Sequence, residues 1–370
     1  MTNKYFHEMK GKFGFGFMRL PMDGDRVDIP HTTAMVDAFL EAGFNYFDTA
    51  HGYIGGQSET ALRETLTSRY PRERYLLTNK LSPSYFDKQE DIREVFQQQL
   101  EACGVDYFDF YLMHAQNTDL FAKYKACKAY ETALELKSEG KIRHMGISFH
   151  DKASVLDQIL TEYPQIEVVQ IQFNYLDYES PRVESRKCYE VCRKHGKPVI
   201  VMEPVRGGQL VNLPTAAVDI LPSLGGGSNA SYAIRFAAGF EGMCMVLSGM
   251  SDLDMVKDNC GFMADFKPLD DRELAAVRQV ADVIDHLDLI PCTSCKYCVD
   301  GCPQSIRIPE LFQCLNKKRR FSNNRSDAQY KEFEVKASAC VQCGQCEEVC
   351  PQQLPIRQLL VKVADEFESA

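Results

Sequence analysis

The sequence predicts an α/β fold in which a (β/α)8 TIM barrel is followed by a smaller, mainly helical domain. Two observations support this fold class. Between about residues 12 and 265, short apolar runs alternate with amphipathic stretches, as in parallel sheets whose buried strands are joined by surface helices. Near the C-terminus, one four-cysteine pattern occurs twice. We therefore expect a barrel over residues 1–265, a linker helix over 266–288 and a cysteine-rich domain over 289–370.

Eight apolar runs fit buried parallel strands. In chain order they read FGFGFM, FNYFDT, YLLTNK, FDFYLMH, IRHMGIS, VVQIQF, KPVIVME and GMCMVLSG. Amphipathic segments follow these runs, and we expect helices at 31–42, 59–68, 92–103, 123–139, 152–163, 183–195, 230–238 and 253–263. Strict alternation of eight strand–helix units favours a closed barrel over a doubly wound sheet. No Gly-x-Gly-x-x-Gly follows the first run, which also argues against the doubly wound alternative.

Glycines that follow predicted helices support this division into strands and helices. Gly43, Gly104, Gly140 and Gly196 each stand just past a predicted helix, where a left-handed residue commonly ends the last turn. The segment PLDDRELAAVRQVADVIDHL reads as one amphipathic helix that links the two domains.

The C-terminal domain contains two copies of the pattern C-x2-C-x2-C-x3-C-P, formed by Cys292, Cys295, Cys298 and Cys302, and by Cys340, Cys343, Cys346 and Cys350. This spacing holds 4Fe–4S cubanes in bacterial-type ferredoxins, where the fourth cysteine ligates the other cluster. We therefore expect two clusters, the first on Cys292, Cys295, Cys298 and Cys350 and the second on Cys340, Cys343, Cys346 and Cys302. The alternatives are zinc sites or disulfides, but zinc sites usually take two C-x2-C pairs rather than a run of four ending in proline. A long helical insert separates the copies and favours a mainly helical, ferredoxin-like domain.

Composition and charge narrow the function classes. The net charge of -10 argues against a nucleic-acid partner, and no apolar run approaches the length of a membrane span. The N-terminal residues lack the apolar segment of a secretory signal. Clusters and free thiols together indicate a reducing compartment, so we expect a cytoplasmic protein. The remaining cysteines read as small core hydrophobes: Cys103, Cys127, Cys188, Cys192, Cys244, Cys260 and Cys314.

A short basic run, Lys317 to Arg320, lies between the two cysteine patterns. It has two interpretations. The first is the solvated end of a helix, and the second is a docking patch for an acidic electron carrier.

The C-terminal ends of the predicted strands carry polar side chains, and chemistry in (β/α)8 barrels gathers at those ends. In chain order these residues are Asp48, Lys80, His114, Ser148, Gln170 and Glu203. Tyr53 follows Asp48 by five residues, on the loop that leaves the second strand. Taken singly, a buried Asp–Lys pair or a lone histidine is often structural. Their joint placement favours a catalytic site.

The barrel sequence resembles the aldo/keto reductase superfamily over about residues 12–265. The resemblance rests on six segments in order: FDTAHGYIGGQSE, LTNK, YLMH, GIS, VVQIQFNY and MEPVRGG. With its two cysteine runs, the chain is similar to the ferredoxin-fused branch of that superfamily.

The resemblance implies a catalytic tetrad of Asp48, Tyr53, Lys80 and His114. Tyr53 would be the general acid that protonates the oxygen of a ketone or aldehyde. The ordinary pKa of tyrosine is near 10, so this role needs the cation of Lys80 beside it, and Asp48 would pair with Lys80. His114 would orient and polarise the carbonyl.

The resemblance also implies a nicotinamide site. Ser148 and Gln170 would hydrogen-bond the carboxamide, and Met202 occupies a position that commonly stacks on the nicotinamide ring. The loop covering the pyrophosphate would include Pro204, Gly207, Gly208 and Leu210. The adenosine segment would include Ser248, Gly249, Asp258 and Asn259.

Departures from the family pattern bear on the cofactor. Phe149 stands where asparagine is common, and Met202 replaces an aromatic ring. Asp254 and Met255 occupy the region of the basic pair that binds the 2′-phosphate of NADP. An acidic residue there repels a phosphate, so we expect NAD to bind at least as well as NADP.

The cofactors expected in the barrel and in the cysteine-rich domain transfer different numbers of electrons. A nicotinamide transfers two electrons as a hydride and a 4Fe–4S cluster takes one, so a flavin stays a further candidate cofactor. We expect an oxidoreductase acting on a small-molecule carbonyl or alcohol with NAD or NADP. Its clusters would be structural or would exchange electrons with a redox partner such as a ferredoxin. The alternative is an electron-transfer or flavin-dependent redox protein whose barrel binds a ligand or partner without turnover.

Overall fold

A computed structural model describes residues 3–322 and 325–369 of the 370-residue chain. These residues form two compact units. The first comprises Met1–Pro204 and Ala230–Leu269, and the second comprises Val205–Asn229 and Asp270–Ala370. The second unit thus gains a segment from the middle of the sequence, which the predicted boundaries at 265 and 289 assign to the barrel. Those boundaries stay a prediction.

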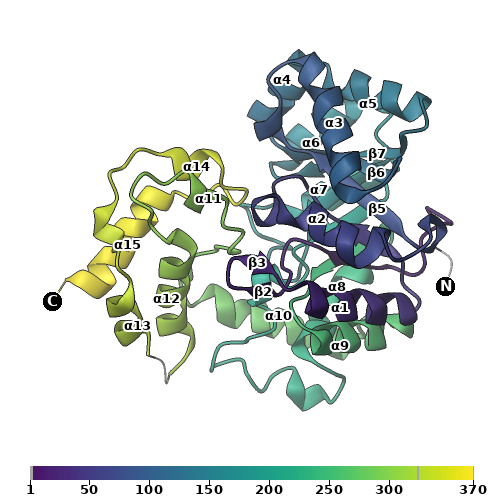
Figure 1. Cartoon of the computed structure of the whole chain (residues 1–370). Helices are drawn as coiled ribbons and strands as arrows, with labels where there is room; N and C mark the ends of the chain where they lie inside the picture. Colours follow the sequence, from purple (N-terminus) through teal and green to yellow (C-terminus); the bar gives the residue numbers. More distant parts are fainter. Residues whose placement is uncertain (1–2, 323–324, 370) are drawn as a thin grey trace. The chain divides into compact units, whose positions relative to one another are not determined.

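Eight parallel strands close into a barrel in the order β1-β10-β9-β8-β7-β6-β5-β4, with helices outside them (Figure 1). Strand β1 pairs with both β4 and β10, which closes the ring. The strands are β1 (Phe13–Gly16), β4 (Tyr46–Asp48), β5 (Leu76–Leu81), β6 (Phe108–Gln116), β7 (Ile142–Phe149), β8 (Val168–Gln172), β9 (Val199–Met202) and β10 (Met243–Gly249). Each predicted apolar run overlaps one of these strands, and β5, β6 and β7 extend beyond their runs by one or two residues. The (β/α)8 prediction is therefore confirmed. A short hairpin of β2 (Met22–Asp23) and β3 (Arg26–Val27) was not predicted.

The helices of the barrel follow the predicted segments. They are α1 (Ile29–Glu41), α2 (Gln57–Leu62), α3 (Gln89–Cys103), α4 (Thr118–Ala126), α5 (Ala129–Ser138), α6 (Ala153–Glu162), α7 (Ser185–Lys194), α8 (Asn229–Ala238) and α9 (Leu253–Ala264). The four glycines expected just past helices all have positive φ. One prediction is wrong, because the helix expected at 123–139 is two helices. Lys128 has a φ of 51°, and a left-handed residue interrupts the helical hydrogen-bond ladder.

The strand register fixes which side chains share the C-terminal end of the barrel. Asp48 is paired with Thr78, two residues before Lys80 on β5. Ser148 at the end of β7 is paired with Gln170 on β8. Residues two apart on a strand point to the same face, so the register groups the polar side chains at this end.

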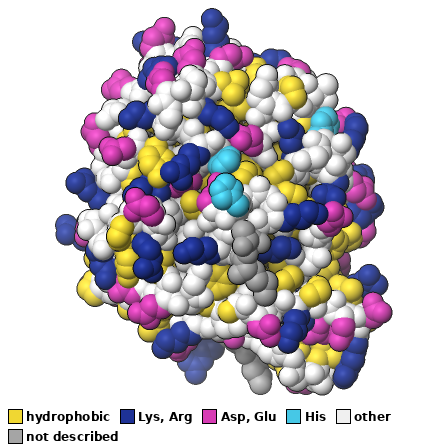
Figure 2. Space-filling view, turned by 90° about the vertical axis from the view of Figure 1, so that its right-hand side faces the viewer, with side chains coloured by type: hydrophobic (Ala, Val, Ile, Leu, Met, Phe, Trp, Pro, Cys, Tyr) yellow, Lys and Arg dark blue, Asp and Glu magenta, His cyan; other side chains and the backbone are white. Residues whose placement is uncertain are grey.

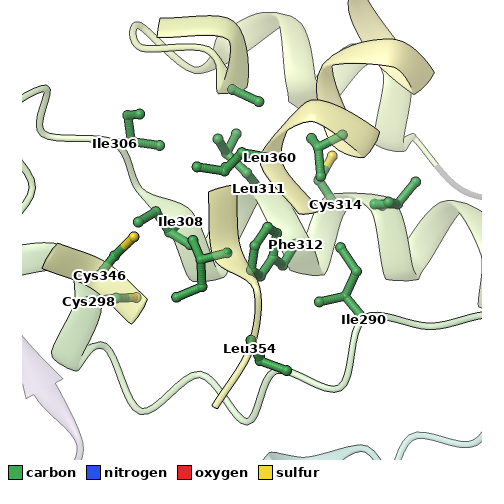
Figure 3. Close-up of a cluster of buried hydrophobic side chains, with 14 of the residues drawn as sticks. Ile290, Cys298, Ile306, Ile308, Leu311, Phe312, Cys314, Cys346, Leu354 and Leu360 are labelled. Atoms are coloured by element: carbon green, nitrogen blue, oxygen red, sulfur yellow. The ribbon is translucent and has the colours of Figure 1, made fainter. Parts of the chain in front are cut away.

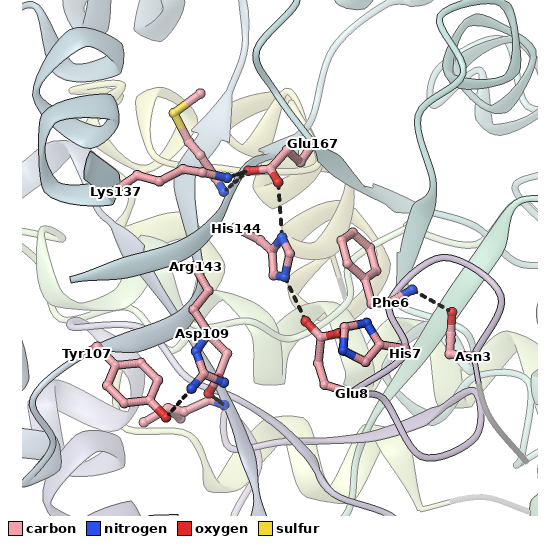
Figure 4. Close-up of polar contacts among 12 residues, drawn as sticks. Asn3, Phe6, His7, Glu8, Tyr107, Asp109, Lys137, Arg143, His144 and Glu167 are labelled. Carbon is pink, nitrogen blue, oxygen red and sulfur yellow. Dashed lines mark hydrogen bonds and ion pairs between the residues drawn. The ribbon is translucent and has the colours of Figure 1, made fainter. Parts of the chain in front are cut away.

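The N-terminal ends of the strands are packed by the first residues of the chain. Phe6 is buried against Phe110 of β6. The imidazole of His144 lies between two carboxylates: its Nε2 is 2.7 Å from Glu8 Oε1 and its Nδ1 is 3.0 Å from Glu167 Oε1 (Figure 4). Burial lowers the pKa of His144, but hydrogen bonds to Glu167 and Glu8 outweigh it, so the net pKa is raised.

Surface charges are mixed on the side of the molecule drawn in Figure 2. Lys and Arg side chains there are interspersed with Asp and Glu, and histidines lie near the centre of the view. This face therefore carries no continuous region of one charge.

The second unit is mainly helical, as predicted for the C-terminal domain. Its helices are α10 (Asp271–Asp285), α11 (Tyr297–Asp300), α12 (Ile308–Arg320), α13 (Ser326–Glu332), α14 (Gln345–Glu348) and α15 (Ile356–Glu368). Ile308, Leu311 and Phe312 of α12 are fully buried with Leu360 of α15, and Cys298 and Cys346 belong to the same apolar core (Figure 3). The seven cysteines outside the two patterns are all buried. Within residues 3–322 and 325–369, no helix has the length and apolarity needed to cross a membrane.

The basic run at the end of α12 is paired within its own unit. Lys318 lies 2.9 Å from Asp327 and 3.0 Å from Glu366, and Arg319 lies 2.9 Å from Asp288. The Arg320 side chain is buried, with 7% of its surface exposed. Arg320 is therefore not part of a solvated helix end, while Lys318 and Arg319 form ion pairs at the surface, and the docking patch stays a hypothesis.

Candidate active site and cluster sites

Three of the predicted catalytic side chains meet at the ends of β4 and β5. Lys80 Nζ donates to Asp48 Oδ1 at 2.5 Å and to the carbonyl of Thr49 at 2.8 Å. The same Nζ lies 4.8 Å from the centroid of the Tyr53 ring. Lys80 has no exposed surface and Asp48 is 4% exposed. The structure thus brings a buried ammonium next to a phenol, with one carboxylate holding it.

The electrostatics of this pair follow from burial. Burial lowers the pKa of the Lys80 ammonium, and contact with Asp48 opposes this change. A second hydrogen bond orients the carboxylate, because Gln170 Nε2 lies 3.4 Å from Asp48 Oδ2. A cation held beside a phenol stabilises the phenolate, so this geometry suits proton transfer from Tyr53.

His114 completes the predicted tetrad. Its ring centroid is 5.9 Å from that of Tyr53, and its Nδ1 is 2.7 Å from Ser82 Oγ. Burial lowers the pKa of His114 well below the ordinary value, and Lys80 and His150 lower it further. The imidazole is therefore neutral near pH 7, so its ring nitrogens can take part in hydrogen bonds without a positive charge on the ring.

A bulge in β6 sets the position of His114. The register between β6 and β7 shifts between Met113 and Gln116, and Ala115 has a φ of 58°. The backbone N–H of Ala115 donates to Ser148 Oγ at 2.8 Å. Ser148, predicted to bind a nicotinamide carboxamide, thus also holds the backbone next to His114, while its own hydroxyl hydrogen can still be donated.

A buried polar layer behind Lys80 was not predicted. Glu59 is 1% exposed and accepts from Asn79 Nδ2 at 2.7 Å, and its other oxygen lies 2.7 Å from His51 Nδ1. Asn79 Oδ1 accepts from the backbone N–H of Lys80 at 2.8 Å and from Gln99 Nε2 at 3.0 Å.

Some of the residues around the predicted tetrad could have been found from the sequence. Ser82, which contacts His114, stands two residues after Lys80, hence on the same face of the strand path. Glu59 and His51 lie in the segment around Tyr53, whereas Gln99 is a helix residue with no signal that distinguishes it from its neighbours.

The predicted cofactor residues are divided between the two units. Ser148, Gln170, Met202, Pro204, Ser248, Gly249, Asp258 and Asn259 belong to the barrel unit, and Gly207, Gly208 and Leu210 belong to the second unit. Asn259 Nδ2 lies 3.5 Å from Ser248 Oγ, so these two predicted residues are neighbours. Met202 is half-buried, and Phe149 is 3% exposed.

The residues expected to meet the adenosine 2′ position lie at the N-terminus of α9. Asp252 caps this helix by accepting from the backbone N–H of Met255 at 2.8 Å. Asp254 is an acidic residue in the first turn, and Lys257 is exposed. A carboxylate therefore already uses an N–H group that a phosphate would otherwise bind.

The first set of cysteines lies around one pocket. Cys292, Cys295, Cys298 and Cys350 line it together with Ile308, Phe312 and Leu354. Burial raises the pKa of the Cys298 thiol, and the neighbouring thiols of Cys295, Cys292 and Cys350 raise it further. Three thiols of the first pattern and the fourth of the second pattern thus share one apolar pocket. This donor set fits a 4Fe–4S cluster with crossed ligation.

The second set is arranged in part. Burial raises the pKa of Cys346 to about 11, with Glu347, Cys340 and Cys343 adding to the increase. Cys302 packs against the same apolar core as Cys340 and Cys346. Within the described part of the chain, no three His, Cys, Asp or Glu side chains form a site for a single metal ion.

The two cysteine loops have the same backbone pattern. Ser294 and Lys296 have positive φ, two and four residues after Cys292. Gln342 and Gly344 have positive φ at the same offsets from Cys340. A left-handed backbone conformation at the same offsets gives the two loops similar turns, as expected for two copies of one cluster-binding motif.

Comparison with protein families finds one match over the barrel region and another over the cysteine-rich region. The Aldo/keto reductase family profile matches residues 12–282, and the 4Fe-4S dicluster domain profile matches residues 291–354.

Two relatives illustrate the sequence similarity. The chain is 31% identical over 216 residues to the NADH-specific methylglyoxal reductase of Escherichia coli, covering 53% of this chain and 62% of that protein. It is 24% identical over 295 residues to the L-galactose dehydrogenase of Arabidopsis thaliana, covering 74% and 91%. The chain spans less than two thirds of the length of the first curated relatives it matches, at 60% to 62%.

Solved structures share the fold. An aldo-keto reductase from Klebsiella pneumoniae in complex with NADPH has a TM-score of 0.60 at 19% identity, covering 73% of this chain and 90% of that one. The holo form of an aldo-keto reductase from Bacillus halodurans has a TM-score of 0.58 at 24% identity, covering 73% and 92%. These similarities concern the barrel architecture.

Proposed function

This chain belongs to the aldo/keto reductase family and carries a C-terminal 4Fe-4S dicluster domain, and from this premise we propose that its barrel interconverts a small carbonyl compound and the corresponding alcohol with a nicotinamide cofactor. One observation carries the proposal: Lys80, held by Asp48, lies 4.8 Å from the Tyr53 ring centroid in a buried site. A phenol beside a fixed cation is suited to deliver a proton to a developing alkoxide.

Each residue of the proposed site has one task in reduction. Tyr53 donates its hydroxyl proton to the carbonyl oxygen. Lys80 stabilises the resulting phenolate, and Asp48 keeps the ammonium in place. His114, neutral and fixed through Ser82, donates a hydrogen bond that orients the carbonyl.

The nicotinamide, when bound, supplies the hydride, so one carbonyl, one NADH and one proton become one alcohol and one NAD⁺. Ser148 and Gln170 are the residues proposed to hold its carboxamide. Ser248 and Asn259, which are 3.5 Å apart, are proposed for the adenosine part. Gln170 also contacts Asp48, so this residue would link cofactor binding to the orientation of the pair.

We propose that NADH serves as the reductant at least as well as NADPH. Asp252 accepts a hydrogen bond from the backbone N–H of Met255 at the start of α9, and Asp254 adds a second negative charge there. A 2′-phosphate carries close to two negative charges and its recognition usually relies on a cation. The similarity to a reductase that is NADH-specific supports the same choice.

The cysteines of the second unit are proposed to hold two 4Fe–4S clusters, which exchange single electrons when bound. The apolar walls around Cys292, Cys295, Cys298 and Cys350 would keep water from the first of them. We propose a redox protein, such as a ferredoxin, as the electron-transfer partner. The paired basic residues of α12 are not its docking patch in this proposal.

One observation favours the alternative function, a redox protein without carbonyl turnover. The loop expected to cover the cofactor pyrophosphate belongs to the cluster-bearing unit. In this alternative, the barrel binds a ligand or partner without turnover. A flavin would couple the one-electron steps of the clusters to a two-electron step.

The test uses the anaerobically purified full chain with NADH and methylglyoxal, a small oxoaldehyde chosen because the Escherichia coli relative is a methylglyoxal reductase. The proposal predicts NADH oxidation only when an aldehyde is present, with one alcohol formed per NADH consumed. NADH oxidation that reduces the clusters without any aldehyde, or a bound flavin in the absorbance spectrum, would favour the alternative. No oxidation with any of a panel of small aldehydes and ketones would contradict the proposal.

A further inference from the structure

The two cysteine loops differ in how much of each is exposed. In the second loop Cys343 is exposed, and Val341, two residues before it, keeps 56% of its surface exposed. In the first loop, Cys295 holds the same place in the pattern as Cys343 but is only partly exposed, and Thr293 is buried. The second set of cysteines is therefore the more accessible of the two.

The first loop is covered by a segment of its own unit. Residues 205–229 belong to the second unit together with both cysteine patterns. Gln209 Nε2 donates to the backbone carbonyl of Cys292 at 2.7 Å. A Cβ atom placed on Gly207 would lie 2.6 Å from the carbonyl oxygen of Thr293, so the two backbones are in close contact. The covered loop and the apolar pocket together shield the first set of cysteines from water.

The second loop has a cation fixed beside it. Gln342 Nε2 donates to Cys340 Sγ at 3.7 Å, and the carbonyl of Gln342 accepts from Arg357 Nη1 at 3.4 Å. Glu347 holds the guanidinium by accepting from Arg357 Nη2 at 2.8 Å and Nε at 3.0 Å. Contact with Glu347 raises the pKa of Arg357, and Cys346 and Cys340 raise it further. The guanidinium therefore lies near two of the ligands expected for the second cluster.

Exposure and nearby charge set the reduction potential of a 4Fe–4S cluster. Reduction adds a negative charge, which an apolar pocket disfavours and which water or a fixed cation stabilises. Hydrogen bonds to sulfur occur in both loops, because Cys292 Sγ accepts from the backbone N–H of Ser294 at 3.4 Å. Lys296 lines the first pocket but is exposed, so water screens its charge. Exposure and charge thus both favour reduction at the second set.

From these contacts we infer that the second cysteine set is the site at which this chain exchanges single electrons with its redox partner, and that Arg357 holds the potential of this site above that of the first set. The inference rests on the proposed function, in which the cysteines hold two 4Fe–4S clusters. In each exchange one electron passes from a reduced one-electron carrier to the second cluster. The carrier loses the electron that the cluster gains, and no bond or proton is transferred.

The experiment measures the two reduction potentials of the anaerobically purified full chain, by titration with dithionite followed by electron paramagnetic resonance. Arg357→Met removes the cation beside the second loop, and Glu347→Gln removes the carboxylate that pairs with it. Lys362→Met is the control, because Lys362 is a cation of the same helix, α15, that lies 2.6 Å from Asp288. Iron content is recorded for each protein.

The unmodified chain should show two separate one-electron reductions. Arg357→Met should make the easier of them less favourable by about tenfold in the equilibrium constant, which is about 59 mV for one electron, and should leave the other in place. Glu347→Gln should move the same reduction in the opposite direction, which a merely structural contact would not produce. Lys362→Met should move neither.

A second measurement identifies the site of exchange. Cys295→Ser and Cys343→Ser change the same place in the two patterns, and each removes one cluster. The benzyl viologen radical, a one-electron carrier, then reduces the cluster that remains, and stopped-flow absorbance gives the rate. Cys295→Ser should be reduced as fast as the unmodified chain. Cys343→Ser should be reduced at least about tenfold more slowly, because its remaining cluster lies in the covered apolar pocket.

Each result decides a separate claim. Equal potentials for the two clusters, no shift of the easier reduction in Arg357→Met, or shifts of the same sign in Arg357→Met and Glu347→Gln would overturn the inference and leave the proposed clusters standing. Faster reduction of Cys343→Ser than of Cys295→Ser would overturn it as well. The potentials decide the inference even if both cysteine variants lose all their iron. About four irons in the unmodified chain, instead of about eight, would overturn both the inference and the proposed pair of clusters.

Discussion

Lys80 Nζ lies 2.5 Å from Asp48 Oδ1, and neither residue is exposed by more than 4%. An ion pair of this kind holds two charges in a site where either one alone would be strongly destabilising. The arrangement therefore fixes the ammonium beside Tyr53 and ties the proposed chemistry to the stability of the barrel.

Lys80→Met should reduce both activity and stability. It leaves Asp48 as an uncompensated buried carboxylate, so the free energy of unfolding in urea should fall by about 3 kcal/mol or more. Carbonyl reduction should fall at least about 100-fold, because nothing then stabilises the Tyr53 phenolate. The double variant Lys80→Met/Asp48→Asn should regain much of the stability and none of the activity. Unchanged stability in Lys80→Met would mean that the pair is not charged.

The crossed ligation of the clusters predicts a specific pattern of losses. The chain should bind about eight irons, four per cluster. Cys350→Ser should damage the same cluster as Cys292→Ser, and Cys302→Ser should damage the other, as seen by iron analysis and electron paramagnetic resonance. Cys244→Ser, in the barrel, is the control and should keep both clusters. If Cys350→Ser instead matches Cys340→Ser, ligation is not crossed.

Charge at the start of α9 predicts the nucleotide preference. NAD should bind at least as tightly as NADP when both dissociation constants are measured at one salt concentration. Asp254→Arg should tighten NADP binding about tenfold, roughly 1.4 kcal/mol, with little effect on NAD. Asp265→Arg, which makes the same change at the other end of the helix, should affect neither. NADP binding tenfold tighter than NAD in the unmodified chain would refute the charge argument.

The group formed by His144, Glu8 and Glu167 at the N-terminal ends of the barrel strands predicts how stability depends on pH. The raised pKa of His144 gives stabilisation that is complete below about 6.5 and is lost as pH rises through the folded pKa. Glu167, whose pKa is lowered to about 2 by hydrogen bonds to His144 and Lys137 against the effect of burial, stabilises above about 4.5 and less as pH falls towards 2.

The free energy of unfolding should therefore contain a contribution that is largest between about pH 4.5 and 6.5. Urea unfolding across this range and above it, for the unmodified chain and His144→Gln, measures it. The variant should lack the decline above pH 6.5 that the histidine causes. Parallel pH profiles for the two proteins would contradict this assignment.

Much of the fold was predictable because each barrel strand is a short apolar run buried on both faces. The strand ends then placed Asp48, Lys80 and His114 near one another without any knowledge of the structure. The break at Lys128 was not predictable, because neither glycine nor proline marks it.

Contacts distant in sequence account for the rest. The loop after β9 is held by a hydrogen bond between Gln209 and Cys292, which are 83 residues apart. One of the two carboxylates that flank His144 comes from Glu8, 136 residues away. Neither pairing leaves a local pattern in the sequence, since each joins segments that are far apart in the chain but belong to the same folded unit.

The central claim is that Tyr53 is the proton donor of a nicotinamide-dependent carbonyl reduction. Its most direct test is the single-turnover rate of Tyr53→Phe with saturating NADH and methylglyoxal, together with NADH affinity. The account predicts a rate lower by at least about 100-fold, with the NADH dissociation constant unchanged within about twofold, because only the hydroxyl is removed. A variant that keeps more than about a tenth of the unmodified rate, with chemistry limiting, would contradict the assignment of Tyr53 as the acid.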